Sequence, residues 1–140
     1  MFDAFKNIAI VPARDGSKGY PGKNFKTFNE KPLFLHAIDQ ALRTCDCCIF
    51  SSDNLDALRK AENMQNVYLH KRAARLSGDD APIDKTLINI IDNFNLVDKS
   101  LILLQPTSPL RLDSSITKAI KKFNNNKFDL VMGVTEANSS

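Results

Sequence analysis

Cysteine and histidine are scarce in this sequence, which narrows the chemistry that it can carry. There are three cysteines, two histidines and no tryptophan among its 140 residues. The cysteines are odd in number and crowded, so they make a poor disulfide framework, and their spacing is not that of a zinc ribbon. We therefore expect packed, reduced thiols at Cys45, Cys47 and Cys48. His36 and His70 have no nucleophile or ligand partner visible in the sequence, and we expect neither to be catalytic.

Long hydrophobic runs are also absent. No apolar stretch approaches the roughly 20 residues that span a bilayer. The stretch 7–11 is too short for the core of a signal peptide, and the polar segment 12–15 follows it at once. We therefore expect a cytoplasmic protein with no membrane partner.

A strong excess of charge is missing as well. The formal net charge is +3, and aromatic residues make up 8% of the chain. A nucleic-acid binder usually has a denser basic stripe or an aromatic platform, so we expect no nucleic-acid partner. A local group of lysines and arginines around a small anionic ligand would explain the same excess.

What the sequence does contain is strands and helices in alternation. Hydrophobic residues make up 43% and charged residues 25% of the chain, which has the length of one domain, 1–140. Short β-rich runs alternate with segments of helical periodicity, which predicts an α/β three-layer sandwich around a mostly parallel sheet. The expected strands are 7–11, 47–51, 67–69, 101–104 and 130–134.

Four helices are expected between these strands. Pro32 would stand in the first turn of the first helix, the segment 52–54 would cap the second, and Asp113 would cap the fourth. Their inward faces are predicted from spacing: Leu33, Ala37, Ile38, Ala41 and Leu42; Leu55, Leu58 and Ala61; Ile83, Leu87, Ile90, Ile91 and Phe94; Ile116, Ala119, Ile120 and Phe123.

The long segment 14–31 after the first strand is predicted to be a loop and is rich in glycine and lysine. Ligands of open α/β sheets bind outside the carboxyl ends of the strands, which is where this loop begins. Glycines let the backbone N–H groups approach a ligand, while Arg14, Lys18 and Lys23 add the charge that a polyphosphate needs. The spacing is neither that of a Walker A loop nor GxGxxG. The alternative is a solvated basic loop.

The segment after the fourth strand is the second candidate. Gln105, just before Pro106, and Thr107 and Ser108, between Pro106 and Pro109, offer donors and acceptors. Prolines reduce the freedom of a loop, which would preorganise a contact to a sugar or a base. A stiff turn followed by a helix cap is an equally good interpretation.

Four other polar residues follow strands. Asp53 could hold a metal, although a helix cap is the favoured interpretation. Arg72 could reach a phosphate or a base, although an exposed arginine is commoner. Asp79 and Asp80 could help to bind magnesium, although acids also suit the start of a helix.

Four ordered segments, which together extend over most of the chain, resemble one family. Residues 10–24 (IVPARDGSKGYPGKN) resemble the opening signature of the acylneuraminate cytidylyltransferases, the CMP-sialic acid synthetases. Residues 50–53, 72–81 and 103–111 resemble three further motifs of that family in the right order. The resemblance implies a nucleotide-diphospho-sugar transferase-like, Rossmann-like fold.

The resemblance also implies a reaction and a set of residues. The anomeric hydroxyl of a nine-carbon 2-keto acid sugar attacks the α-phosphate of CTP, and pyrophosphate leaves with help from Mg²⁺. By position, the catalytic residues would be Arg14, Lys18 and Lys23. The nucleotide would contact Arg14, Ser17, Lys18, Lys23, Asn24 and Arg72, and the acceptor sugar would contact Gln105, Thr107 and Ser108.

Some features depart from the family pattern. Asp15 stands where glycine is common, and Tyr20 stands where an aliphatic residue is common. Family members are homodimers and considerably longer, with a later segment that supplies metal-binding aspartates and the dimer arm. Residues 134–138 resemble the start of that arm. We therefore expect a fragment or a truncated gene product, with no metal ligands of its own and weak or absent turnover alone.

Two alternatives stay open. The chain could be a non-catalytic module that binds CTP, or it could belong to an enzyme whose acceptor is legionaminic, pseudaminic or 3-deoxy-manno-octulosonic acid. The Gly19 and Gly22 pattern and the Gln-Pro-Thr-Ser segment favour the acylneuraminate group over the octulosonate enzymes by resemblance.

Overall fold

Five parallel strands form the central sheet. The computed structural model describes residues 2, 4–14, 26–72, 83–106, 111–125 and 131–133. Within them the strand order is β5-β4-β1-β6-β7, and every neighbouring pair is parallel. All five predicted strands are confirmed, with ends that differ by at most two residues. They are β1 (Asn7–Ala13), β4 (Cys47–Ser52), β5 (Val67–Lys71), β6 (Ser100–Leu103) and β7 (Val131–Gly133).

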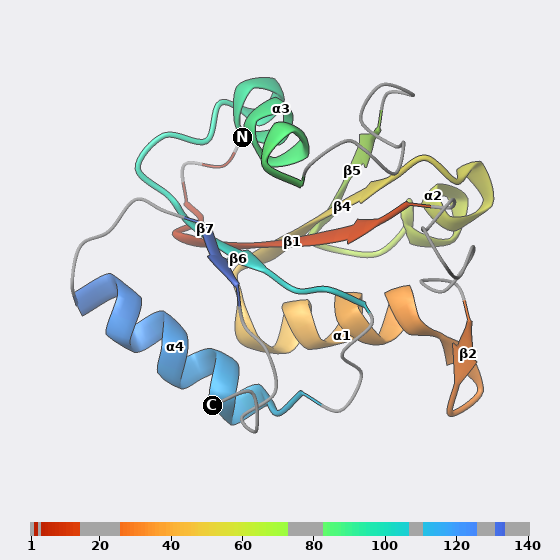
Figure 1. The fold of residues 1–140 in the computed structure, drawn as a ribbon, viewed down its shortest axis with the longest axis horizontal. Helices are drawn as coiled ribbons and strands as arrows, with labels where there is room; N and C mark the ends of the chain where they lie inside the picture. Colours follow the sequence, from red (N-terminus) through yellow and green to blue (C-terminus); the bar gives the residue numbers. More distant parts are fainter. Residues whose placement is uncertain are drawn as a thin grey trace.

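Four helices cover the sheet in the described part of the chain. In Figure 1, α1 and α4 lie on one side of the sheet and α3 lies on the other. The inner side chains of α2 enter the same core cluster as those of α1 and α4. The predicted three-layer α/β sandwich with a parallel sheet is therefore confirmed. The helices are α1 (Leu33–Thr44), α2 (Leu55–Ala61), α3 (Ile83–Phe94) and α4 (Asp113–Asn125).

Alternate side chains of β1 enter two different cores, because successive residues of a strand point to opposite faces of the sheet. Ala9 and Val11 lie in the cluster with α1, α2 and α4, whereas Ile8 and Ile10 lie in the cluster with α3. All four side chains are completely buried. Burial on both faces explains why this strand is a nearly continuous apolar run.

The three cysteines are free thiols, as predicted. Cys47 and Cys48 enter opposite cores, and the half-buried Cys45 packs beside Cys48 in one of them. Burial raises the pKa of Cys45 to about 11 and that of Cys47 to about 12. The thiolate is the reactive form of cysteine, so these side chains are inert near neutral pH.

A short antiparallel hairpin occupies part of the segment in which a loop was expected. β2 (Thr27–Phe28) pairs with β3 (Lys31–Pro32). The two residues between them, Asn29 and Glu30, have positive φ angles of 49° and 70°. Two positive φ values at a two-residue connection define a type I′ turn, which suits the twist of a hairpin. The usual sequence signal for this turn is Asn-Gly or Asp-Gly. Here glutamate stands in the place of glycine, so the sequence did not predict the turn.

Details at the helix starts correct the prediction for Pro32, Leu55 and Asp113 and confirm that the segment 52–54 caps α2. Pro32 is the N-cap residue of α1 and does not stand in its first turn. Asn54 caps α2, since its Oδ1 accepts from the backbone N–H of Ala57 at 2.9 Å. Leu55, expected on the inner face of α2, is 52% exposed. Asp113 is the first residue of α4 and does not precede it as a cap.

Candidate functional site

The order of the strands identifies a candidate ligand-binding position at the carboxyl edge of the sheet. From β1 the chain adds β4 and then β5 on one side, and later returns to pair β6 with the other side of β1. In open parallel sheets this reversal leaves a crevice outside the carboxyl ends of the two central strands, where ligands bind. Arg14 directly follows β1, and Gln105 follows β6 after one intervening residue. Both therefore stand at this position.

Two predicted nucleotide-binding arginines follow strands of the sheet at this edge. Arg14 follows β1, and Arg72 follows β5. Burial lowers the pKa of Arg72, the nearby positive charge of Arg14 lowers it further, and the carboxylate of Asp53 after β4 opposes both effects. The site therefore contains two guanidinium groups and one carboxylate.

The prediction that Asp53 caps α2 is wrong. The neighbouring Asn54 provides the cap, and the backbone N–H of Asn54 donates to the Oγ of Ser52 at 3.1 Å. The Ser52 hydroxyl in turn donates to the carbonyl oxygen of Ala13 at 2.6 Å. This hydroxyl ties the end of β4 to the end of β1, so that the residues after both strands start from fixed positions.

Arg72 is held in place by both its backbone and its side chain. Its backbone N–H donates to the carbonyl of Ser52 at 2.9 Å, which extends the pairing of β4 and β5 by one step. Its Nη2 donates to the Oγ1 of Thr86 on α3 at 3.0 Å. Arg72 is only 6% exposed, and Thr86 is completely buried. Contrary to the commoner case for arginine, this guanidinium is largely withdrawn from solvent.

His70 joins three elements beside Arg72. Its Nδ1 lies 2.8 Å from the Oγ of Ser51, and its Nε2 lies 2.7 Å from the Oδ1 of Asn89. An amide oxygen can only accept, so Nε2 carries the proton and Nδ1 accepts from the serine hydroxyl. Burial lowers the pKa of His70, which keeps the ring neutral. Ser51 is completely buried, so this chain of hydrogen bonds serves to fix β4, β5 and α3 together.

The second histidine also has a partner. The Nε2 of His36 on α1 makes a hydrogen bond with the carbonyl oxygen of Phe28, and the two rings meet edge to face with centroids 5.6 Å apart. These contacts hold the β2–β3 hairpin against α1. Both histidines therefore have structural roles, although the sequence revealed neither set of contacts.

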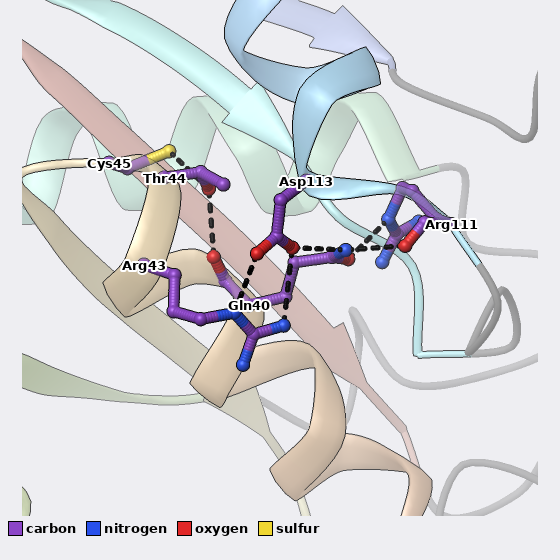
Figure 2. A network of polar contacts seen from close by, with 6 residues as sticks. All are labelled: Gln40, Arg43, Thr44, Cys45, Arg111 and Asp113. Carbon is purple, nitrogen blue, oxygen red and sulfur yellow. Dashed lines mark hydrogen bonds and ion pairs between the residues drawn. The ribbon is translucent and has the colours of Figure 1, made fainter.

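A buried network anchors the segment that follows β6 (Figure 2). The Nη2 of Arg111 donates to the carbonyl oxygen of Gln105 at 3.1 Å. Its Nε donates to the Oε1 of Gln40 at 2.8 Å. Gln40 returns a hydrogen bond from its Nε2 to the carbonyl oxygen of Arg111 at 2.6 Å. Arg111 is 5% exposed and Gln40 is 6% exposed. The two ends of the segment 105–111 are therefore tied to each other and to α1.

The same network continues to the protein surface. The Nε2 of Gln40 also donates to the Oδ1 of Asp113 at 2.9 Å, and Arg43 donates from its Nε to the Oδ2 at 2.7 Å. The hydrogen bond from Arg43 lowers the pKa of Asp113, and the same bond raises the pKa of Arg43. Figure 2 shows Gln40 and Arg43 reaching from α1 toward Asp113.

Sequence reasoning missed Gln40 and Thr86, although a signal was present. Gln40 follows Ala37 by three residues, and Thr86 precedes Ile90 by four, so both stand on the apolar face of their helix. A polar residue in such a position is buried, and a buried polar side chain needs a partner. Arg111 and Arg72 are those partners.

The remaining predicted residues lie outside the described part of the chain. This holds for Ser17, Lys18, Lys23, Asn24, Thr107 and Ser108, and also for Asp79 and Asp80. Gln105 is exposed at the carboxyl edge. Of the predicted site residues, the described ones are thus Arg14, Arg72 and Gln105.

In the described ranges, no group of three or more histidine, cysteine, aspartate or glutamate side chains is placed to hold a metal ion. Asp53 contributes one carboxylate to this edge. One carboxylate can bind Mg²⁺ together with the phosphates of a nucleotide, but it does not make an all-protein cage. A search of the same ranges finds no helix long and apolar enough to cross a membrane.

Comparison with known sequences matches residues 8–140 to the cytidylyltransferase family. A CMP-N,N'-diacetyllegionaminic acid synthase of Legionella pneumophila is 34% identical over 81% of this chain and 51% of its own length. An N-acylneuraminate cytidylyltransferase of Streptococcus agalactiae is 31% identical over 94% of this chain and 32% of its own length. A pseudaminic acid cytidylyltransferase of Campylobacter jejuni is 31% identical over 94% of this chain and 59% of its own length. The chain thus spans between about a third and three fifths of these relatives.

Solved structures with the same fold include two enzymes that make cytidylyl conjugates. The structure of CMP:2-keto-3-deoxy-manno-octonic acid synthetase complexed with CTP superposes with a TM-score of 0.68 at 17% identity, over 86% of this chain and 48% of that one. The structure of 4-diphosphocytidyl-2C-methyl-D-erythritol synthase superposes with a TM-score of 0.66 at 12% identity, over 86% of this chain and 55% of that one. These likenesses establish a shared fold. The match over residues 8–140 shows that this chain is a member of the cytidylyltransferase family.

Proposed function

We propose that residues 1–140 are the nucleotide-binding domain of an enzyme that transfers CMP from CTP to a nonulosonic acid of the N-acylneuraminate type. The observation that supports this most directly is that Arg14 and Arg72 both stand at the carboxyl edge of the sheet, directly after β1 and β5. A pair of guanidinium groups in that position is suited to a polyphosphate ligand, because the planar fork of arginine matches phosphate geometry.

The reaction needs little covalent chemistry from the protein. The anomeric hydroxyl oxygen of the sugar forms a bond to the α-phosphorus of CTP, and the bond from that phosphorus to the oxygen leading to the β-phosphate breaks. Pyrophosphate leaves with the bonding electron pair, and the hydroxyl proton is lost to water. Positioning of the two substrates and neutralisation of charge supply most of the rate in transfers of this kind.

The buried position of Arg72 strengthens its proposed role. A cation that is largely withdrawn from water attracts an anion more strongly than an exposed one, because the solvent screens it less. Asp53 after β4 adds a carboxylate that can share a cation with the triphosphate. Mg²⁺ bound in this way would neutralise part of the charge on the nucleotide.

The acceptor is proposed at the level of its chemical class. Gln105 stands at the same edge of the sheet as Arg14, just after β6, and Arg111 ties its backbone in place. Relatives named for legionaminic, acylneuraminic and pseudaminic acids are 34%, 31% and 31% identical to this chain. Such similar values favour no one of the three acids, so we propose a nonulosonic acid and name no single sugar.

Calorimetric titration of the chain with CTP in the presence of Mg²⁺ tests this proposal. CTP should bind, and ATP, GTP and UTP should bind at least tenfold more weakly. Arg72→Ala should weaken CTP roughly 10- to 100-fold, since a charge-assisted hydrogen bond is worth about 1.5–3 kcal/mol. Arg14→Ala should act in the same direction.

Arg59→Ala is the matched control, because Arg59 is an exposed arginine on α2 whose side chain contacts Asp56 at 3.6 Å. It should leave the affinity for CTP unchanged. The proposal fails if folded protein binds no nucleotide, binds all four equally, or loses as much affinity with Arg59→Ala as with Arg72→Ala.

A further inference from the structure

α3 contacts β5 through two pairs of polar side chains at matched spacing. Thr86 and Asn89 are three residues apart and therefore share one face of the helix. His70 and Arg72 are two residues apart and share one side of the extended chain. The Nη2 of Arg72 donates to Thr86 at 3.0 Å, and the Nε2 of His70 lies 2.7 Å from the Oδ1 of Asn89. Asn89 on the helix thus contacts His70 on the strand, and Thr86 contacts Arg72, which directly follows the strand.

Burying the polar groups that make these contacts costs free energy. Arg72 is 6% exposed, His70 is 4% exposed and Thr86 is completely buried. Burying a charged or polar group costs desolvation energy, and apolar side chains of the same size often stabilise a fold as well or better. Packing α3 against β5 would therefore not by itself require a guanidinium and a hydroxyl. If the Thr86 hydroxyl serves to orient the Arg72 guanidinium, the presence of both polar groups is explained.

A single hydrogen bond to an arginine can set the direction of the whole group. The guanidinium is planar and carries five N–H donors in a fixed arrangement. Fixing Nη2 against Thr86 therefore fixes the directions of the other donors as well. Arg72 directly follows β5, so its guanidinium is carried at the carboxyl edge of the sheet, where Arg14 follows β1 and Asp53 follows β4.

We propose that Thr86 is a positioning residue for the nucleotide, acting through Arg72. Its hydroxyl holds the guanidinium in the orientation that the bound nucleotide requires, while the hydrogen-bonded set of Ser51, His70 and Asn89 fixes the strand that carries it. This inference rests on the proposed function, because it assigns to α3 a part in the same nucleotide site.

The chain allows a test with closely matched variants. Thr86→Val removes the accepting oxygen and keeps the β-branched shape, whereas Thr86→Ser keeps the hydroxyl. Thr117→Val makes the same change on α4, where the Thr117 hydroxyl is exposed and donates to the carbonyl of Ser114 at 3.1 Å. Calorimetric titration with CTP and Mg²⁺ should show about fivefold to tenfold weaker binding for Thr86→Val. Thr86→Ser should stay within about twofold of the unchanged protein, and Thr117→Val should match it.

A purely structural role for Thr86 predicts a different pattern. Thr86→Val would then lower the midpoint of thermal unfolding and leave the affinity for CTP unchanged at a temperature well below that midpoint. Unchanged affinity for CTP in Thr86→Val would overturn the inference. So would a loss of affinity in Thr86→Ser as large as that in Thr86→Val.

A second measurement needs no nucleotide. The ¹⁵N–¹H resonance of the Arg72 side chain, assigned through its loss in Arg72→Lys, should shift and exchange faster with water in Thr86→Val than in Thr86→Ser. Identical Arg72 resonances in the two variants would overturn the inference even if CTP binds. If the unchanged protein binds no CTP, the proposed function fails and the nucleotide role of Thr86 fails with it. The arginine resonance would still report separately whether Thr86 holds the guanidinium.

Discussion

At the scale of single residues, Gln40 shows what an amide can do that neither a carboxylate nor a hydrocarbon can. Its oxygen accepts from Arg111, while its nitrogen donates to the Arg111 carbonyl and to Asp113. Gln40→Leu would remove both functions from a buried position. We expect it to lower the free energy of unfolding by about 2–3 kcal/mol, because a buried guanidinium would lose an acceptor. Urea denaturation followed by circular dichroism measures this change.

The same network contains its own control. Arg43 pairs with Asp113 at the surface, where the two side chains are 56% and 43% exposed. Water screens such a pair, so Arg43→Ala should cost about 0–1 kcal/mol. Equal losses for Arg43→Ala and Gln40→Leu would contradict our account, because the buried amide would then have no special part in the network.

The cysteines allow a prediction about reactivity. Burial raises the pKa of Cys45 to about 11 and that of Cys47 to about 12, against about 8.5 for a free thiol. In folded protein at pH 8, we expect iodoacetamide to label these thiols at least tenfold more slowly than in urea-unfolded protein, with Cys45 reacting first because it is half-buried. Mass spectrometry of the alkylated peptides gives the rates.

The sign of the pH dependence follows from the same shifts. Unfolded thiols lose their protons near pH 8.5, whereas the folded ones keep them until about pH 11 or higher. The buried thiols therefore favour the folded state below pH 8.5, and this contribution is lost as the pH rises through the interval between the two values. Rapid labelling of Cys47 at pH 8 in folded protein would contradict the burial seen here.

At the scale of elements, the β2–β3 hairpin carries two residues in an unfavourable backbone region. Asn29 tolerates positive φ well, but Glu30, with φ of 70°, does so at a cost. Glu30→Gly would produce the Asn-Gly sequence that a type I′ turn favours. We expect it to raise the free energy of unfolding by about 0.5–1 kcal/mol, as measured by urea denaturation.

Glu62 provides the matched comparison for this substitution. It is also an exposed glutamate, but it lies in the right-handed helical region with φ of −64° at the end of α2. Glycine has no conformational advantage there, so Glu62→Gly should lower stability by about 0.5–1 kcal/mol. A change of the same sign at both positions would show that the backbone angle of Glu30 is not the cause.

The order and type of the main elements could be predicted because local patterns specify them. Apolar runs such as residues 101–104 and the helical spacing of residues 83–94 locate β6 and α3 without any knowledge of the rest of the chain. The hairpin was missed because its turn has glutamate in the place of glycine. Leu55 was placed inward because α2 has only seven residues, too few for spacing to define one face reliably.

At the scale of the whole molecule, a bound nucleotide should stabilise the fold that creates its site. A ligand that binds only the folded state adds about 2.7 kcal/mol at a concentration 100 times its dissociation constant. We therefore expect CTP with Mg²⁺ to raise the midpoint of thermal unfolding by several degrees, whereas UTP and ATP at the same concentration should have little effect. Equal shifts with all nucleotides, or none with CTP, would contradict the proposed site.

The position of the site could be predicted in outline, since polar residues after parallel strands meet at one edge. That rule places Arg14, Arg72 and Gln105 in the same region. It could not show that Arg72 is buried, that Thr86 is its partner or that Gln40 anchors Arg111. Those pairs are 14 and 71 residues apart in the sequence, and only the packing of helices on the sheet brings them together.

The central place of β1 has a consequence for how the chain folds. β1 precedes the other strands of the sheet along the chain, yet one of its edges pairs with Ser100–Leu103, more than 90 residues later. Until that segment leaves the ribosome, Ile8 and Ile10 belong to a strand with one open hydrogen-bonding edge. Pairing over such sequence distances is slow, and an open apolar strand readily joins another chain. Chaperones that bind apolar segments therefore have reason to protect β1 until β6 has been made.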